Sequence, residues 1–304
     1  MVWNGARQEM FCNRPIEHPS RTPKLNRNPW HLVIHFEWNS LMRASRLLPF
    51  CSVLLLAHVL QASQVPVRYP EGLSRGFLIL RAQDGKQIGV GESSQTVKRG
   101  RVTEHVIFRL KDGSIYEETS VFTQRRTFRL LSDHVLQKGP TFKMQMESSI
   151  DAVTGHVVVH YSEGGNSKTL DQKVDMPDDV ANGLISTIVK DILPDAVTEV
   201  SYLTLSPKPR LAKVTLTREG KDKFFGGGAA YEAVHYVMKM KVTGAVGVLA
   251  SALGKQPPDT QLWVFPGEAP AFAASEGPLA ADAPIWRVEL VSPVLSEKSE
   301  SRER

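Results

Sequence analysis

The stretch "VIFRLKDGS", residues 106–114, holds the pattern that decides the fold. Val106, Phe108 and Leu110 stand at alternate positions, so their side chains lie on one face of an extended strand. An Asp-Gly dipeptide follows at once, and this pair favours the tight turn of a β-hairpin. The stretch therefore predicts a strand that leads into a hairpin.

The same pattern recurs on both sides of this stretch. Turn sequences follow one another at intervals of roughly ten to fifteen residues. They are "QDGKQ" at 83–87, "KRGR" at 98–101, "TGH" at 154–156 and "EGGN" at 163–166. Apolar residues alternate between the turns, as in the sets Phe142, Met144, Met146 and Val157, Val159, Tyr161. We therefore expect an antiparallel meander of hairpins across residues 76–175.

One segment has a helical period instead. In "MPDDVANGLISTIVKDILPD", residues 176–195, apolar side chains recur every three to four positions. The apolar stripe consists of Val180, Ala181, Leu184, Ile185, Ile188, Val189, Ile192 and Leu193. Asp178 and Asp179 suit the positive N-terminal end of a helix, one of them as its cap, and Pro194 ends it. We expect this helix to lie on the apolar face of the sheet.

Strands are expected again at residues 197–205, 212–218, 231–242, 262–265 and 286–291. The small and apolar residues 243–255 are compatible with a short helix that ends at Gly254. No repeat or linker divides residues 76–293, so we expect a single β-rich domain there and a disordered tail at 294–304. The expected fold class is mainly β (α+β), a single curled antiparallel sheet or half-barrel with one amphipathic helix packed on its concave face.

The chain begins with a segment of different character. Residues 42–63 read as a secretory signal peptide, with a basic start, an apolar core of about 14 residues at 47–60 and small residues at its end. The core is short for a membrane span. Residues 1–41 have no period, so we expect a non-translated or disordered extension and a start at Met42. The mature protein is then exported to the periplasm or cell envelope without a stable transmembrane span.

The net charge of +5 arises in this leader. Seven of the 37 Lys and Arg, but only three of the 32 Asp and Glu, precede Gln64, which leaves 30 basic and 29 acidic residues. A nearly neutral domain argues against nucleic acid as a partner. Both cysteines, Cys12 and Cys51, also lie in the leader, so the domain needs no disulfide and has no thiol nucleophile.

No motif for catalysis or cofactor binding stands out. His156 and His160 share a strand face but lie roughly 13 Å apart along it, which is too far for one zinc ion. The adjacent Glu117 and Glu118 diverge on a strand. The glycine run "FFGGGAAY" at 224–231 lacks the lysine and hydroxyl of a phosphate loop and indicates a turn. We therefore expect no metal and no cofactor, and a binding protein more readily than an enzyme.

A curled sheet with a helix on its concave side would form a cavity with an apolar lining. Methionine suits such a lining because its side chain adapts to irregular ligands. The candidate ligand-binding residues are Met144, Met146, Met238, Met240, Leu249, Leu253, Trp263, Phe265 and Trp286. Trp263 is expected at the cavity mouth, beside a lid hinged at Gly244 and Gly254. The alternative that these side chains are ordinary core stays open.

Four segments resemble uncharacterised exported bacterial β-rich proteins of domain-of-unknown-function families. They are "PDDVANGLISTIVKDILPD", "PKPRLAKVTL", "GKQPPDTQLWVFPGEAPAF" and "EGPLAADAPIWRVELVSP". The resemblance covers most of residues 76–293 and is strongest after residue 178. It implies a fold similar to that of the lipoprotein carriers, a half-barrel around helices that holds acyl chains, and it carries over no catalytic residues.

The sequence thus predicts an exported envelope protein that binds an apolar or amphipathic ligand, such as a lipid or lipoprotein acyl chains. Two alternatives stay open. The first is a structural or interaction protein that docks an envelope protein through a sheet edge or an aromatic corner. The second is a hydrolase with a non-motif active site, for which Arg287, His235 and Glu289 are the candidates.

Overall fold

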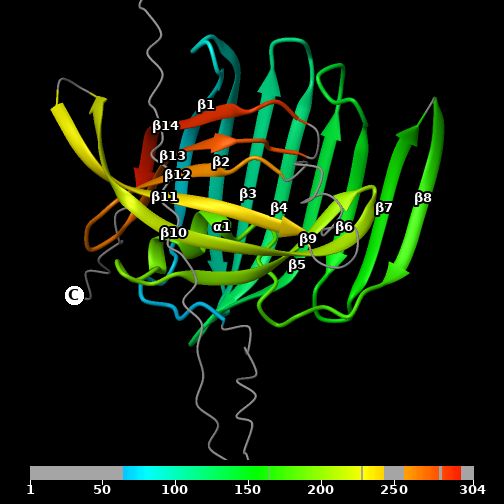
Figure 1. Ribbon diagram of the computed structural model, residues 1–304, viewed down its shortest axis with the longest axis horizontal. Helices are drawn as coiled ribbons and strands as arrows, with labels where there is room; N and C mark the ends of the chain where they lie inside the picture. The colour runs from blue at the N-terminus through cyan, green and yellow to red at the C-terminus, as the bar shows by residue number, and fades with distance from the viewer. Residues whose placement is uncertain (1–63, 164, 227–228, 243–256, 281–282, 296–304) are drawn as a thin grey trace, which may run out of the picture. The chain divides into compact units, whose positions relative to one another are not determined.

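The computed structural model describes residues 64–163, 165–226, 229–242, 257–280 and 283–295. Within these residues the chain forms fourteen strands and one short helix (Figure 1). The strands are β1 Ser74–Ala82, β2 Gln87–Lys98, β3 Arg101–Leu110, β4 Ile115–Gln124, β5 Phe128–Lys138, β6 Met146–Asp151, β7 His156–Glu163, β8 Asn166–Lys173, β9 Thr198–Ser206, β10 Lys208–Gly226, β11 Ala229–Val242, β12 Thr260–Phe265, β13 Ala271–Gly277 and β14 Trp286–Leu295. The helix α1 is Ile185–Ile188, and the 3₁₀ turn η1 Val189–Asp191 continues it.

All fourteen strands belong to one antiparallel sheet. Each strand from β1 to β8 pairs with the next, and so does each strand from β9 to β14. β1 also pairs with β14, which joins the two runs and leaves β8 and β9 as the edges. The turns lie where the sequence predicts them, and Gly100 and Gly113 supply their positive φ angles of 75° and 86°. The predicted meander and the mainly β class are confirmed.

The two runs of the sheet pack against each other across α1. One apolar cluster takes its members from β3–β5, from α1 and from β9–β12. Examples from these parts are Val102, Phe122, Ile188, Val214 and Leu262, all at most 4% exposed. In Figure 1, β9–β11 accordingly cross in front of β3–β6. We call the face that carries this cluster the inner face of the sheet and the opposite one the outer face.

Two further clusters extend the inner core. The second is formed by β1–β4 and β14 around Phe108 and Trp286, and the third by β6, β7 and Leu203 of β9. Glycine makes room in the second cluster, because a Cβ at Gly91 would lie 2.5 Å from the Phe108 ring. The alternation predicted for residues 106–110 and 286–290 is thus confirmed as inward-facing core.

The predicted helix over residues 176–195 is wrong in its extent. Only four residues are α-helical, and no side chain caps α1, so neither Asp178 nor Asp179 acts as a cap. The earlier part of the segment is extended, since Val180 forms a parallel bridge with Ser201 of β9. Gly183 adopts a φ of +65°, which keeps α1 from continuing toward the N-terminus.

The expected curled sheet or half-barrel is also corrected. The sheet stays open, because β8 and β9 do not pair with each other, so it does not close into a barrel. Its two runs form facing layers, and α1 fills the space between them with apolar side chains. A concave side with a long helix is therefore not the arrangement of this chain.

Several predictions concern residues outside the described part of the chain. They include the extension and signal peptide before residue 64, the lid hinged at Gly244 and Gly254 with Leu249 and Leu253, and residues 296–304 of the tail. These stay predictions. The first two residues of the tail expected at 294–304 are not disordered but belong to β14. No helix among the described residues is long and apolar enough to cross a membrane.

Candidate functional site

A pocket lies where the segment before α1 meets the first described residues. Its walls are Val65, Phe128, Val180, Ala181, Leu184, Ile188 and Val200, with Gln64 and Asp179 as its polar members. The backbone of Val65 is fixed beside β5, because its carbonyl accepts a hydrogen bond of 3.0 Å from the Phe128 N–H. We call this the α1 pocket; its free volume of about 10 Å³ is the space of a single water molecule.

Asp179 is the unusual member of the α1 pocket. Its side chain is fully buried, and neither carboxylate oxygen accepts a hydrogen bond. Lys213 Nζ lies 3.6 Å from Asp179 Oδ2 and equally far from Glu199 Oε1, so it offers charge without a close bond. Buried carboxylates normally accept hydrogen bonds because burial removes their water. Asp179 therefore presents free acceptors to a donor group that enters the pocket.

A second group of carboxyls lies on the inner face beside α1. Glu104, Glu118 and Asp133 come from β3, β4 and β5, and we call them the acidic row. The register pairs Glu104 with Ser120 and Ser120 with Asp133, so the three strands present these groups side by side. Period-two alternation places them inward, between the first and second apolar clusters.

Hydroxyl groups supply the hydrogen bonds of the acidic row. Tyr116 donates to Glu118 Oε2 at 3.0 Å, and Ser120 donates to Asp133 Oδ1 at 2.8 Å. Thr187 of α1 donates to Glu104 Oε2 at 3.1 Å. Within the described residues, no Lys or Arg forms an ion pair with Glu118 or Asp133, and no three His, Cys, Asp or Glu side chains are placed to hold a metal ion.

Burial raises the pKa values of the acidic row. Burial and the neighbouring Asp133 raise the pKa of Glu118 to about 8, and burial raises the pKa of Asp133 to about 6. Burial likewise raises the pKa of Glu104, although Lys190 opposes it. Tyr202 faces the row from β9, and burial together with the two carboxyls raises its pKa. Near neutral pH the row therefore holds both a protonated and an ionised carboxyl, the pairing that acid–base chemistry uses.

The chain just before α1 is held tightly over the acidic row. The Asn182 amide bonds both backbone groups of Leu203, donating to its carbonyl at 2.9 Å and accepting from its N–H at 2.8 Å. The next residue, Gly183, packs on the row so closely that a Cβ would collide with the Ser120 hydroxyl and lie 2.9 Å from Asp133 Oδ1. The segment just before α1 therefore contributes to the α1 pocket and also packs on the acidic row.

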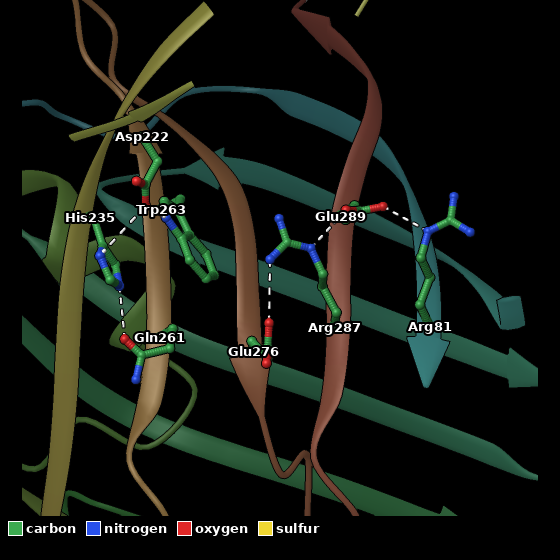
Figure 2. Close-up of polar contacts among 8 residues, drawn as sticks. All are labelled: Arg81, Asp222, His235, Gln261, Trp263, Glu276, Arg287 and Glu289. Carbon is green, nitrogen blue, oxygen red and sulfur yellow. Dashed lines mark hydrogen bonds and ion pairs between the residues drawn. The ribbon is translucent and has the colours of Figure 1, made fainter. Parts of the chain in front are cut away.

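The outer face carries a separate polar network (Figure 2). Glu289 of β14 accepts hydrogen bonds from Arg287 Nε at 2.8 Å and from Arg81 Nε of β1 at 2.9 Å. Arg287 also reaches Glu276 of β13 at 3.4 Å. Burial alone would raise the pKa of Glu289, but the two arginines outweigh it and hold that pKa below its usual range. These charges satisfy one another.

Trp263 is enclosed at the other end of this network. The His235 ring stacks on its indole at 4.8 Å with 9° between the planes, and the Arg287 guanidinium lies 4.8 Å from the indole centre. The indole N–H donates to Asp222 Oδ2 at 2.7 Å (Figure 2). His235 Nε2 donates to Gln261 Oε1 at 2.8 Å. Trp263 is only 7% exposed, so its ring faces are already occupied.

The predicted ligand-binding residues do not gather in one site. Met238 and Met240 pack on the cluster around α1, Met146 belongs to the third cluster and Trp286 to the second. Trp263 and Phe265 lie on the outer face. Met144 precedes β6, where its carbonyl accepts a bond from Gln137. Their role in binding stays a prediction, while the hydrolase candidates Arg287, His235 and Glu289 do lie together, on the outer face of the sheet.

Asp179 and the acidic row were missed as sites. The divergence predicted for Glu117 and Glu118 is correct, since Glu117 bonds His105 at 2.8 Å on the outer face. That divergence could have identified Glu118 as a buried carboxyl, because one of two adjacent strand residues must face inward. The burial of Asp179 could not be predicted, because the helical pattern of the segment indicated that Asp179 caps a helix.

The chain resembles known protein structures at low similarity. No family model matches the chain, and no curated protein matches its sequence. The chain is similar to the crystal structure of the hypothetical lipoprotein YmcC from Escherichia coli (K12), with a TM-score of 0.32 and 10% identity over 76% of this chain and 87% of that one. It is also similar to a protein from Bacteroides fragilis NCTC 9343 described as exported and YmcC-like in fold, with a TM-score of 0.30 and 8% identity over 77% of this chain and 100% of that one. TM-scores this low carry no conclusion about the location, ligand or activity of this chain.

Proposed function

We propose that the chain is an exported envelope protein that binds an amphipathic ligand in the α1 pocket. A hydrogen-bond donor in the ligand's head group, an amine or a hydroxyl, fits the water-sized space of the pocket and bonds Asp179. The observation that carries the proposal is the fully buried Asp179 carboxylate without a hydrogen bond. Export rests on the signal-like residues 42–63.

The amphipathic form of the ligand fits better than a purely apolar one. A saturated acyl chain would leave Asp179 without a hydrogen-bond donor. A carboxylate that is buried without a hydrogen bond destabilises the complex by on the order of several kcal/mol, because its hydration is lost. A head group that donates to it removes this cost only when the ligand is bound. The described residues thus favour lipids with an amine or hydroxyl head over free acyl chains.

Native mass spectrometry of the protein purified from residue 63 without detergent tests this proposal. We expect a co-purified or added long-chain amine or hydroxyl lipid at one molecule per chain. Asp179→Asn, which halves the acceptor capacity and removes the charge, should weaken binding on the order of tenfold or more. The matched control is Asp178→Asn, because Asp178 is 71% exposed and pairs with Arg129 outside the pocket. Equal binding by both variants would exclude the α1 pocket.

A second candidate function is docking of an envelope protein on the outer face. Phe77 of β1, Val90 of β2 and Val291 of β14 are 42%, 51% and 51% exposed, beside the charged network of Arg81 and Glu289. An apolar centre with a polar rim is typical of an interface. A photo-crosslinking residue at Val90 should then capture one discrete protein in living cells, whereas the same residue at Val153, also exposed, should not.

A further inference from the structure

Five cations crowd one end of the sheet. The β2–β3 turn carries Lys98, Arg99 and Arg101, and the β4–β5 turn carries Arg125 and Arg126; all five are exposed. The two turns are neighbours, because Arg101 pairs with Thr123, two residues before Arg125. We call these five residues the basic end. The basic end does not show in the net charge, because the domain as a whole is nearly neutral.

The residues that the structure describes do not neutralise the basic end. None of its five side chains has an ion-pair partner in the described part of the chain. The nearby acids are engaged elsewhere, since Asp178 pairs with Arg129 and Glu71 with Lys190. Their positive charge is therefore available to an external anion.

The β2–β3 turn also bears two local costs. Lys98 and Arg101 stand directly opposite each other in the antiparallel register, and like charges in that position repel. Arg99 adopts a φ of +51°, a left-handed conformation that side chains other than glycine rarely adopt. An anion over this turn would relieve the repulsion.

The surroundings favour a membrane surface over a single phosphate. The cations are spread over two turns, and Val97, which precedes Lys98 in β2, is 42% exposed. Exposed cations beside an apolar side chain are typical of contact with lipid head groups. The N-terminal segment also passes here, as the Val67 N–H donates to the Arg126 carbonyl at 3.0 Å.

We propose that the basic end docks on a bilayer surface rich in anionic phospholipid. This inference does not depend on a ligand in the α1 pocket.

Co-sedimentation of the full chain with vesicles tests the inference. One vesicle is phosphatidylcholine alone, and the other contains about one third phosphatidylglycerol; their difference removes any uptake caused by the apolar segment. Since each cation near an anionic surface contributes on the order of 1 kcal/mol, the anionic vesicles should bind at least about tenfold more protein. The preference should shrink as salt is raised.

Charge reversal locates the effect. The variant Lys98→Glu, Arg101→Glu, Arg125→Glu, Arg126→Glu should bind both vesicles equally. The matched control reverses four exposed cations at the opposite end of the strands, Lys86, Lys111, Lys138 and Lys143, and should keep the preference within about twofold. If the first variant does not fold by circular dichroism, the pair Lys98→Gln, Arg101→Gln should give a partial loss.

Two results would overturn the inference. One is an equal loss in both fourfold variants, which would make the effect one of net charge. The other is tight binding of a single-stranded oligonucleotide with no preference between the vesicles, which would make the basic end a nucleic-acid surface.

Discussion

At the scale of single residues, Glu118 makes stability depend on pH. Its pKa is about 8 in the folded protein, so between about pH 5 and 8 the folded state holds a proton that the unfolded chain has released. Stability therefore falls as pH rises through this window. Asp133, with a pKa of about 6, adds the same trend at lower pH.

Replacing Glu118 with glutamine should remove much of this dependence. At pH 8 the variant should melt a few degrees above wild type, for a gain on the order of 1–2 kcal/mol, whereas at pH 5 the two should agree. Glu117→Gln is the control, because Glu117 lies on the outer face and bonds His105. Thermal melts by circular dichroism at both pH values test this prediction. If the stability of the Glu118 variant depends on pH as strongly as that of the wild type, Glu118 is not the group responsible.

At the scale of elements, strands could be predicted and the helix could not. A period of two is a local pattern, and the strands follow it in the sequence. The helical period of residues 180–192 does mark buried side chains, such as Val180 and Ile192 at 4% and 6% exposure. The backbone around it is decided by partners far away, since Asn182 bonds Leu203, 21 residues on. A repeating apolar pattern identifies burial more securely than it identifies a helix.

The close seat of the α1 segment on the acidic row yields a prediction at this scale. Gly183→Ala combines a strained φ of +65° with a collision against Ser120, so it should destabilise the protein by roughly 2–4 kcal/mol. Gly85→Ala is the control, because its φ of +81° is similar but no atom lies within 4 Å, and it should cost about 1 kcal/mol. Urea unfolding measures both, and equal losses would show that Gly183 matters only for its φ.

At the scale of the whole molecule, the two runs of the sheet are joined by a pairing that no local pattern could predict. β1 pairs with β14, which brings Arg81 to Glu289 across 208 residues. The same pairing brings the hydrolase candidates of β14 beside β1 and sets the two runs of the sheet face to face. The candidate site shares this property, because the α1 pocket combines residues 64, 128, 179 and 200. Sequence reasoning found members of these sites as strand residues, but only the long-range pairing makes them neighbours.

One sheet with a shared core should unfold as one unit, and the tryptophans can show it. From residue 63 onward only Trp263 and Trp286 remain, and they lie in different clusters, one on the outer and one on the inner face. Trp263→Phe and Trp286→Phe therefore each leave a single fluorescent reporter. Because both strands belong to the same ladder, urea unfolding followed through either reporter should give the same midpoint as circular dichroism of that variant. A fluorescence midpoint that departs from circular dichroism in either variant would mean that the two runs unfold separately, and that residues 76–293 are not one cooperative domain.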